Sequence, residues 1–229
     1  MARIKFGNIV VDMRGKISGN VYSKNKGGAY SRVRVVPTNP RSAAQNLVRS
    51  VFTALSQAWQ GLSDSERSGW IQAAINFPAK NSLGDSHTLS GNALYVSLNK
   101  NLADVALSAI DTAPSKVVAT PLDIPTVVAD ASSQTLVATF GSTIPADVAV
   151  KVFASASVSP GVNSIGSKMR QIGYKAAGSA AISSLTTDYL AKFGAVGAAG
   201  DKIFLEFVPV AIANGQLGST IRTSVIIVA

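Results

Sequence analysis

Apolar residues recur at intervals of three and four between residues 40 and 107, which is the periodicity of amphipathic helices. Asn39 followed by Pro40 fits a helix start, because asparagine caps the first amides and proline suits the first helical position. The spacing predicts a helix from Pro40 to Gln60 that ends at Gly61. Its apolar stripe consists of Ala44, Leu47, Val48, Val51, Leu55, Ala58, Trp59 and Leu62.

Two further helices are predicted in the same region. Ser63-Asp64-Ser65-Glu66 is a capping box, in which Ser63 and Glu66 are spaced to satisfy backbone amides at a helix start. The helix that follows has a predicted buried stripe of Trp70, Ile71, Ala74 and Ile75, and it closes at Phe77-Pro78. A third helix starts within Thr88–Asn92, and one face of it is lined by Leu94, Tyr95, Leu98, Leu102 and Val105. Residues 40–110 are therefore predicted to form a small helical unit with its tryptophans as core anchors.

Beyond a linker at Asp111–Pro114, the apolar pattern changes to period two, which is typical of half-buried β-strands. The clearest strands cover residues 133–140, 147–154, 202–210 and 220–228. About seven short strands with turn signals between them predict an antiparallel β-sandwich over residues 114–229. Residues 186–194 are an exception, predicted as a helical turn that Gly194 caps.

The first 39 residues combine β-prone runs with turn residues. Ile9–Val11 and Arg32–Val36 favour extended structure, and Gly and Asn residues interrupt the sequence between them. Alternation on either side of Lys24–Gly28 predicts a hairpin, which is marginally stable alone in water. Residues 1–39 are therefore predicted to be an extended docking arm that lies on a sheet edge or on another subunit. The predicted fold class is α+β: the arm, the helical unit and the sandwich.

Positive charge is concentrated at the N-terminus. Residues 1–50 hold ten Lys or Arg and one acid, Asp12, whereas residues 51–229 hold eleven of each sign. The formal net charge of +9 therefore lies in the first fifth of the chain. A basic segment on a neutral body predicts contact with an anionic partner. Charged residues are only 14% of the chain, against roughly 25% in an ordinary domain, so we expect neighbours to cover much of the surface.

The candidate partner-binding residues are the interleaved cations and tyrosines of the arm: Arg14, Lys16, Tyr22, Lys24, Lys26, Tyr30, Arg32 and Arg34. Three interpretations stay open. The β-prone, Gly-punctuated sequence favours docking on an acidic groove of a protein by strand addition. Nucleic-acid binding is physically admissible, with cations on phosphates and tyrosines on bases, but no named nucleic-acid motif is present. The arm could also be solvated and without a partner.

Residue types for catalysis, cofactors or metals are scarce. The chain has no cysteine and a single histidine, His87, which excludes thiolate and multi-histidine metal sites and a cysteine nucleophile. We expect His87 in an exposed loop. No Gly-x4-Gly-Lys-Ser/Thr loop occurs, and the glycines of Gly194–Gly200 lack the spacing of a dinucleotide fingerprint. We therefore expect a protein that is not an enzyme and takes no cofactor and no metal.

Membrane and export signals are also missing from the pattern. The start of the chain has no apolar core of the signal-peptide kind, and no stretch approaches about 18 uninterrupted apolar residues. We expect no membrane contact, and an intracellular setting or a particle assembled there.

Four pieces of the N-terminal half form a block: Arg14–Arg32 (RGKISGNVYSKNKGGAYSR), Pro37–Gln45, Trp59–Ser63 and Arg67–Trp70. As a block they resemble a type of small structural protein encoded by tailed bacteriophages and prophages, over residues 7–105. The resemblance implies a virion component without catalysis, whose partners are other virion proteins: major capsid, portal, or neck and tail subunits.

The C-terminal part is similar in style to immunoglobulin-like or fibronectin-III modules, which recur on phage capsids and tails. It lacks the Cys…Trp…Cys signature of antibody domains, so only the architecture carries over. These features predict a virion structural protein, assembled in the host cytoplasm as a symmetric homo-oligomer. Its arm and helices would attach it to the capsid or head–tail region as a decoration or connector subunit. Two alternatives remain: a nucleic-acid-binding or packaging protein, and a host-surface adhesion module.

Overall fold

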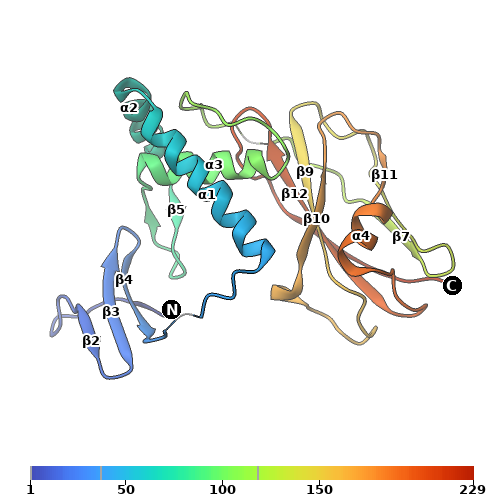
Figure 1. The fold of residues 1–229 in the computed structure, drawn as a ribbon, viewed down its shortest axis with the longest axis horizontal. Coiled ribbons are helices and arrows are strands. Elements are labelled where there is room, and N and C mark those ends of the chain that lie inside the picture. Colours follow the sequence, from blue (N-terminus) through green and yellow to red (C-terminus); the bar gives the residue numbers. More distant parts are fainter. Residues whose placement is uncertain (1, 37, 118) are drawn as a thin grey trace. The chain divides into compact units, whose positions relative to one another are not determined.

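The computed structural model describes residues 2–36, 38–117 and 119–229 and has a mixed α+β fold (Figure 1). The chain divides into two compact units. Unit 1 is Met1–Ser97 with Asp111–Ala113, and unit 2 is Leu98–Ile110 with Pro114–Ala229. This division differs from the predicted one in two respects: the first 39 residues cluster with the helices that follow, and residues 98–110 cluster with the C-terminal strands.

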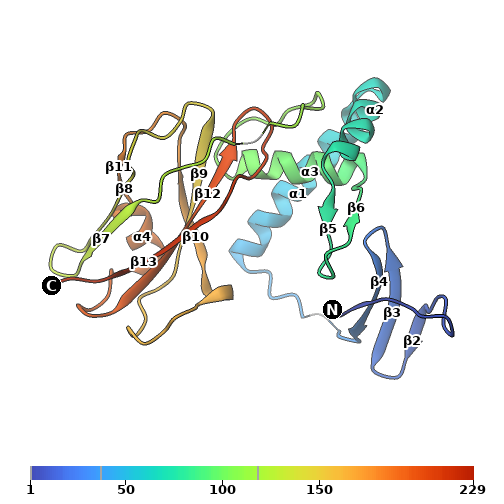
Figure 2. The ribbon, with the colours of Figure 1, turned by 180° about the vertical axis from the view of Figure 1, so that it is seen from behind.

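The segment predicted as an extended arm contains a four-stranded antiparallel sheet, of which β2, β3 and β4 are labelled in Figure 2. Its strands are β1 (Ala2–Ile4), β2 (Gly15–Ile17), β3 (Asn20–Asn25) and β4 (Gly28–Val33), in the order β1-β4-β3-β2. The predicted hairpin is confirmed, since Asn25 pairs with Gly28 across a turn at Lys26-Gly27. The chain returns on itself because Gly and Asn residues supply two tight turns.

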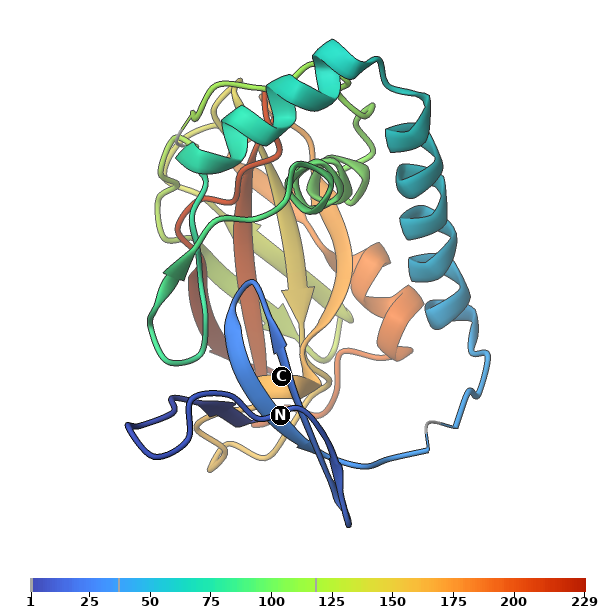
Figure 3. The same cartoon turned by 90° about the vertical axis from the view of Figure 1, so that its left-hand side faces the viewer.

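The helices of unit 1 follow the predicted order. They are α1 (Ala43–Gly61), α2 (Asp64–Ala73), which continues into a 3₁₀ turn η1 (Ala74–Asn76), and α3 (Gly91–Ala103). Residues 98–103 of α3 belong to unit 2. Between α2 and α3 in the sequence, the short strands β5 (Ala79–Lys80) and β6 (Ser86–His87) pair with each other. α1 and α2 meet at a corner (Figure 3), where the predicted Ser63–Glu66 capping box is confirmed.

The predicted start of α1 was wrong. Ser42, not Asn39, is the N-cap, and its hydroxyl accepts from the Gln45 amide at 3.4 Å. Arg41 has φ 49°, a left-handed conformation that a helix cannot contain, so no helix can run from Pro40 through this position. Asn39 instead accepts hydrogen bonds from the backbone of Arg41 and the guanidinium of Arg49.

The core of unit 1 is centred on Trp70, which is fully buried. Its ring meets Tyr95 edge to face at 5.2 Å, and its indole N–H donates to the Asp111 carbonyl at 2.7 Å. The predicted stripe of α2 was half wrong, because Ile71 and Ile75 are 55% and 63% exposed. The stripe of α1 is also largely uncovered in unit 1: Leu55 is its only buried residue within the helix.

The described part of unit 2 contains seven β-strands: β7 (Thr126–Asp130), β8 (Thr135–Thr139), β9 (Val148–Ala154), β10 (Arg170–Lys175), β11 (Ile182–Ser184), β12 (Lys202–Ala211) and β13 (Ile221–Ile226). They form two antiparallel sheets, β10-β9-β12-β13 and β11-β8-β7. One hydrophobic core joins the two sheets, with Leu136 of β8, Val150 of β9 and Phe207 of β12 all completely buried. A short 3₁₀ turn η2 (Gly166–Lys168) precedes β10.

The helical exception predicted in unit 2 is confirmed as α4 (Thr186–Phe193), which ends at Gly194 with φ 85°. Tyr189 anchors α4 to the core, and its phenol donates to the Ser155 carbonyl at 3.1 Å. Burial disfavours the phenolate and raises the pKa of Tyr189 to about 12.

Residues 98–110, which include the C-terminal half of α3, belong to unit 2, where they contact β9 and β12. Val105 shares a small cluster with Ala149 and Val210. The Lys151 ammonium, whose side chain is 6% exposed, lies 3.3 Å from Asp104 Oδ2 and donates to Asn101 Oδ1 at 3.0 Å. These contacts explain why residues 98–110 do not cluster with the rest of the helical region.

A tight turn after β7 makes the contribution of the Asp130 carboxylate to stability depend on pH. Its carboxylate accepts from the Ser132 hydroxyl and amide and from the Ser133 amide, and these bonds lower its pKa from 3.8 to about 2. A lowered pKa adds stability above pH 3.8 that is lost as the pH falls toward 2. We expect the urea midpoint of the wild type to fall more than that of Asp130→Asn over this interval. An equal fall in both proteins would contradict this assignment.

Candidate functional site

The register of the N-terminal sheet sorts its side chains onto two faces, because directly paired residues of antiparallel strands project to the same side. Lys16 pairs with Val21, which pairs with Arg32, and Arg3 pairs with Tyr30. We call the face that carries Arg3, Lys16, Tyr30 and Arg32 the basic face. The opposite, apolar face carries Ile4, Ile17, Tyr22, Ala29 and Val33.

The structure brings three of the eight candidate residues together on the basic face: Lys16, Tyr30 and Arg32. Tyr22 and Lys24 alternate onto the apolar face. The other three are Arg14, which precedes β2, Lys26, which lies in the β3–β4 turn, and Arg34, which follows β4.

Most cations of this sheet are not neutralised within the chain. Between residues 2 and 36, the described ion pairs are Lys5 with Asp85 at 2.9 Å and Arg14 with Asp12 at 3.2 Å. Within the described residues, no carboxylate lies within 4.0 Å of Lys16, Lys24, Lys26, Arg32 or Arg34. All five are exposed. Their positive potential is therefore available to an anionic partner.

A cavity of about 240 Å³, which we call the charged cavity, lies in unit 1. Its walls come from three segments: the end of β1, the β3–β4 turn and the β5–β6 hairpin. The lining residues are Arg3, Ile4, Lys5, Lys26, Gly27, Gly28, Ala29, Asn81, Leu83, Asp85, Ser86 and His87. The expectation of an exposed loop histidine was wrong, since His87 lies in β6, is partly buried and lines this cavity.

Hydrogen bonds tie these three segments together. Arg3 Nη1 donates to the Gly27 carbonyl at 2.6 Å, and the Asn81 amide donates to the same carbonyl at 3.0 Å. Lys5 donates to Asp85. Hydrogen bonds from Lys5 and then Asn81 lower the pKa of Asp85, which keeps this carboxylate ionised. Sequence reasoning missed Arg3, Asn81 and His87, because only the folded chain places them beside the turn.

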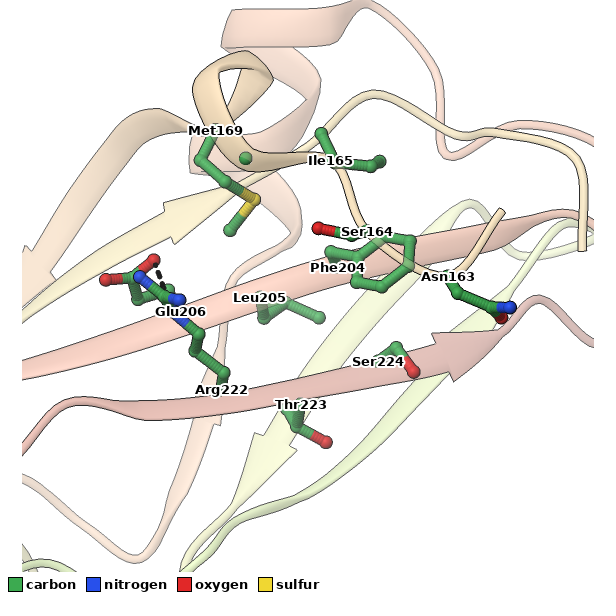
Figure 4. A pocket seen from close by; sticks show the side chains of 11 residues that line it. Asn163, Ser164, Ile165, Met169, Phe204, Leu205, Glu206, Arg222, Thr223 and Ser224 are labelled. Carbon is green, nitrogen blue, oxygen red and sulfur yellow. Dashed lines mark hydrogen bonds and ion pairs between the residues drawn. The ribbon is translucent and has the colours of Figure 1, made fainter. Parts of the chain in front are cut away.

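A second cavity, of about 290 Å³, lies in unit 2 between the 163–169 loop and strands β12 and β13 (Figure 4). Phe204, Ile165 and Met169 give it apolar surface. Glu206 and Arg222 are paired residues of β12 and β13 and form an ion pair at 3.2 Å. Because these two charges neutralise each other, this cavity attracts neither anions nor cations strongly.

Within the described residues, no group of three or more His, Cys, Asp or Glu could hold a metal ion. No helix in that part of the chain is long and apolar enough to span a bilayer. Comparison with protein-family models, curated proteins and solved structures gives no match.

Proposed function

We propose that this protein is a non-enzymatic structural subunit of a tailed-phage virion. The observation that carries the proposal is the N-terminal sheet, most of whose cations are exposed and have no carboxylate within 4.0 Å among the described residues. Such a surface suits docking on an acidic neighbour, because complementary charge steers association and fixes orientation. The sequence block that resembles phage structural proteins spans this sheet and the helices after it.

In this proposal, the N-terminal sheet takes the role of the docking arm, and it acts with the helices of unit 1. It attaches the subunit to the capsid or to the head–tail region, on major capsid, portal, or neck and tail proteins. Unit 2 is an immunoglobulin- or fibronectin-III-like sandwich. Its support is the set of seven strands in two antiparallel sheets around one core. Copies assemble with symmetry in the host cytoplasm and remain in the virion.

The test is incorporation into particles. We expect deletion of residues 1–39 to abolish incorporation, and Lys16→Gln/Arg32→Gln on the basic face to lower the copy number per particle about tenfold. Quantitative mass spectrometry of purified particles measures both. Arg170→Gln/Lys192→Gln is a matched control, since it removes two exposed cations from unit 2 and is expected to incorporate normally.

Normal incorporation of the basic-face variant and of the truncated protein would overturn the proposal. A nucleic-acid role predicts a different result, namely DNA binding by the isolated protein that weakens steeply with salt and is lost in the basic-face variant.

A further inference from the structure

More cations than carboxylates line the charged cavity. Three cations line it, Arg3, Lys5 and Lys26, against the single carboxylate of Asp85. Lys5 forms an ion pair with Asp85, and Arg3 donates its described hydrogen bonds from Nη1. The Lys26 ammonium has no hydrogen-bond or ion-pair partner among the described residues. A negatively charged group in the cavity would meet two uncompensated cations.

His87 supplies an independent indication of a ligand. Its Nδ1 atom is buried and has no hydrogen-bond partner within the described residues. Buried polar atoms in folded proteins are nearly always hydrogen-bonded, because an unpaired one costs its full desolvation energy. This imidazole nitrogen is therefore a buried polar atom that the described residues leave unpaired. An acceptor oxygen would satisfy it through an Nδ1–H donor.

Hydrogen bonds between its walls hold the charged cavity in shape. Arg3 and Asn81 converge on the Gly27 carbonyl, so the β3–β4 turn is held against both β1 and the β5–β6 hairpin. Gly27 is buried, and a Cβ there would lie 2.8 Å from Arg3 Nη1. A glycine at this turn thus leaves room for the Arg3 guanidinium beside it.

The shape and lining of the cavity favour a carboxylate side chain over a phosphate backbone. Ile4, Ala29 and Leu83 give it apolar walls, which suit the methylene groups of a glutamate. A volume of about 240 Å³ admits one side chain but not a nucleic-acid strand. Nucleic-acid binding would instead use cations spread along an open surface, as on the basic face.

We infer that the charged cavity receives an acidic side chain from a partner protein, with Lys26, Arg3 and His87 as its donors. The inference rests on the proposed docking function and deepens it, because it names the partner chemistry as an acidic peptide segment. The basic face then supplies general attraction, and the cavity supplies the specific contact.

The experiment uses the full chain and a fluorescent hexaglutamate peptide, with binding followed by anisotropy. Lys26→Gln is expected to weaken binding about tenfold, since it removes one charge-assisted hydrogen bond. Lys24→Gln is the matched control: it removes another exposed lysine, two positions away, that does not line the cavity, and it is expected to weaken binding less than about twofold. His87→Leu, which leaves the formal charge unchanged, is expected to weaken binding about fivefold.

Equal losses for Lys26→Gln and Lys24→Gln would show that only bulk charge matters and would overturn the inference. Absence of saturable binding by the wild type would overturn it as well. Tighter, Lys26-dependent binding of a dT12 oligonucleotide would assign the cavity to phosphates instead. Particle incorporation separates the two proposals: if Lys26→Gln/His87→Leu incorporates normally and the basic-face variant does not, the inference fails and the docking function stands.

Discussion

Asparagine in place of Asp104 is expected to destabilise unit 2 by about 3–5 kcal/mol, the cost of leaving a buried charge without its partner. The Lys151 ammonium is 6% exposed in its side chain, and the carboxylate of Asp104 lies 3.3 Å away. Without that carboxylate, no negative charge lies within 4.0 Å of the Lys151 ammonium among the described residues, and its neighbour Asn101 Oδ1 is a neutral acceptor. Urea unfolding at neutral pH, followed by circular dichroism, measures the difference in the free energy of unfolding.

The pH dependence identifies the cause of this loss. Desolvation lowers the pKa of Lys151 below 10.5, and Asp104 opposes that effect. Removing Asp104 lowers the pKa of Lys151 further. In the variant, the unfolded chain therefore binds more protons than the folded chain over a wider pH range below 10.5. The free energy of unfolding of the variant rises with pH in that range, so its difference from the wild type becomes smaller. A deficit that stays constant with pH would contradict the buried-lysine explanation.

Two further variants serve as controls for Asp104→Asn. Lys100 also pairs with Asp104, but its side chain is 40% exposed, so Lys100→Ala is expected to cost less than about 1 kcal/mol. Lys151→Met combined with Asp104→Asn removes both charges and is expected to recover part of the lost stability. A double variant no more stable than Asp104→Asn alone would show that the loss comes from packing and not from the unpaired charge.

Local patterns were sufficient to predict most helices and strands, because each depends on neighbouring residues. The Ser63–Glu66 capping box and the Gly194 helix end are of this kind. The buried Lys151 is not. Its neighbours Val150 and Val152 point into the core, so period two places Lys151 on the opposite side, which a sequence assigns to solvent. Only the packing of Asn101 of α3 and of Asp104, which directly follows α3, buries it on that side.

The candidate site also depends on contacts that local sequence patterns do not predict. Charge segregation was enough to predict a basic N-terminal segment, and the hairpin was visible in its turn residues. Strands β1 and β2 have three residues each, and β1 pairs with β4, more than twenty positions away. No local signal fixes that register, so the sequence could not place Arg3 beside Tyr30 on the basic face. The charged cavity depends on the additional approach of the β5–β6 hairpin.

Alanine in place of Trp70 is expected to destabilise unit 1 by about 3–5 kcal/mol, the usual cost of truncating a buried aromatic residue. The ring is completely buried, it packs edge to face on Tyr95, and its N–H donates to the Asp111 carbonyl. Truncation leaves a cavity and an unpaired carbonyl together, which is why we place the cost at the upper part of the range for single substitutions. Thermal and urea unfolding measure it.

Ile71→Ala is the matched control for Trp70→Ala, because the two residues are adjacent on α2 and apolar periodicity assigns both to the buried stripe. The structure separates them, with Trp70 at 0% and Ile71 at 55% exposure. We expect Ile71→Ala to change the free energy of unfolding by less than about 1 kcal/mol. Comparable losses for the two variants would mean that a partner surface, such as a second copy in the sample, covers Ile71. Dilution would then reduce the loss at Ile71, whereas the loss at Trp70 would not depend on protein concentration.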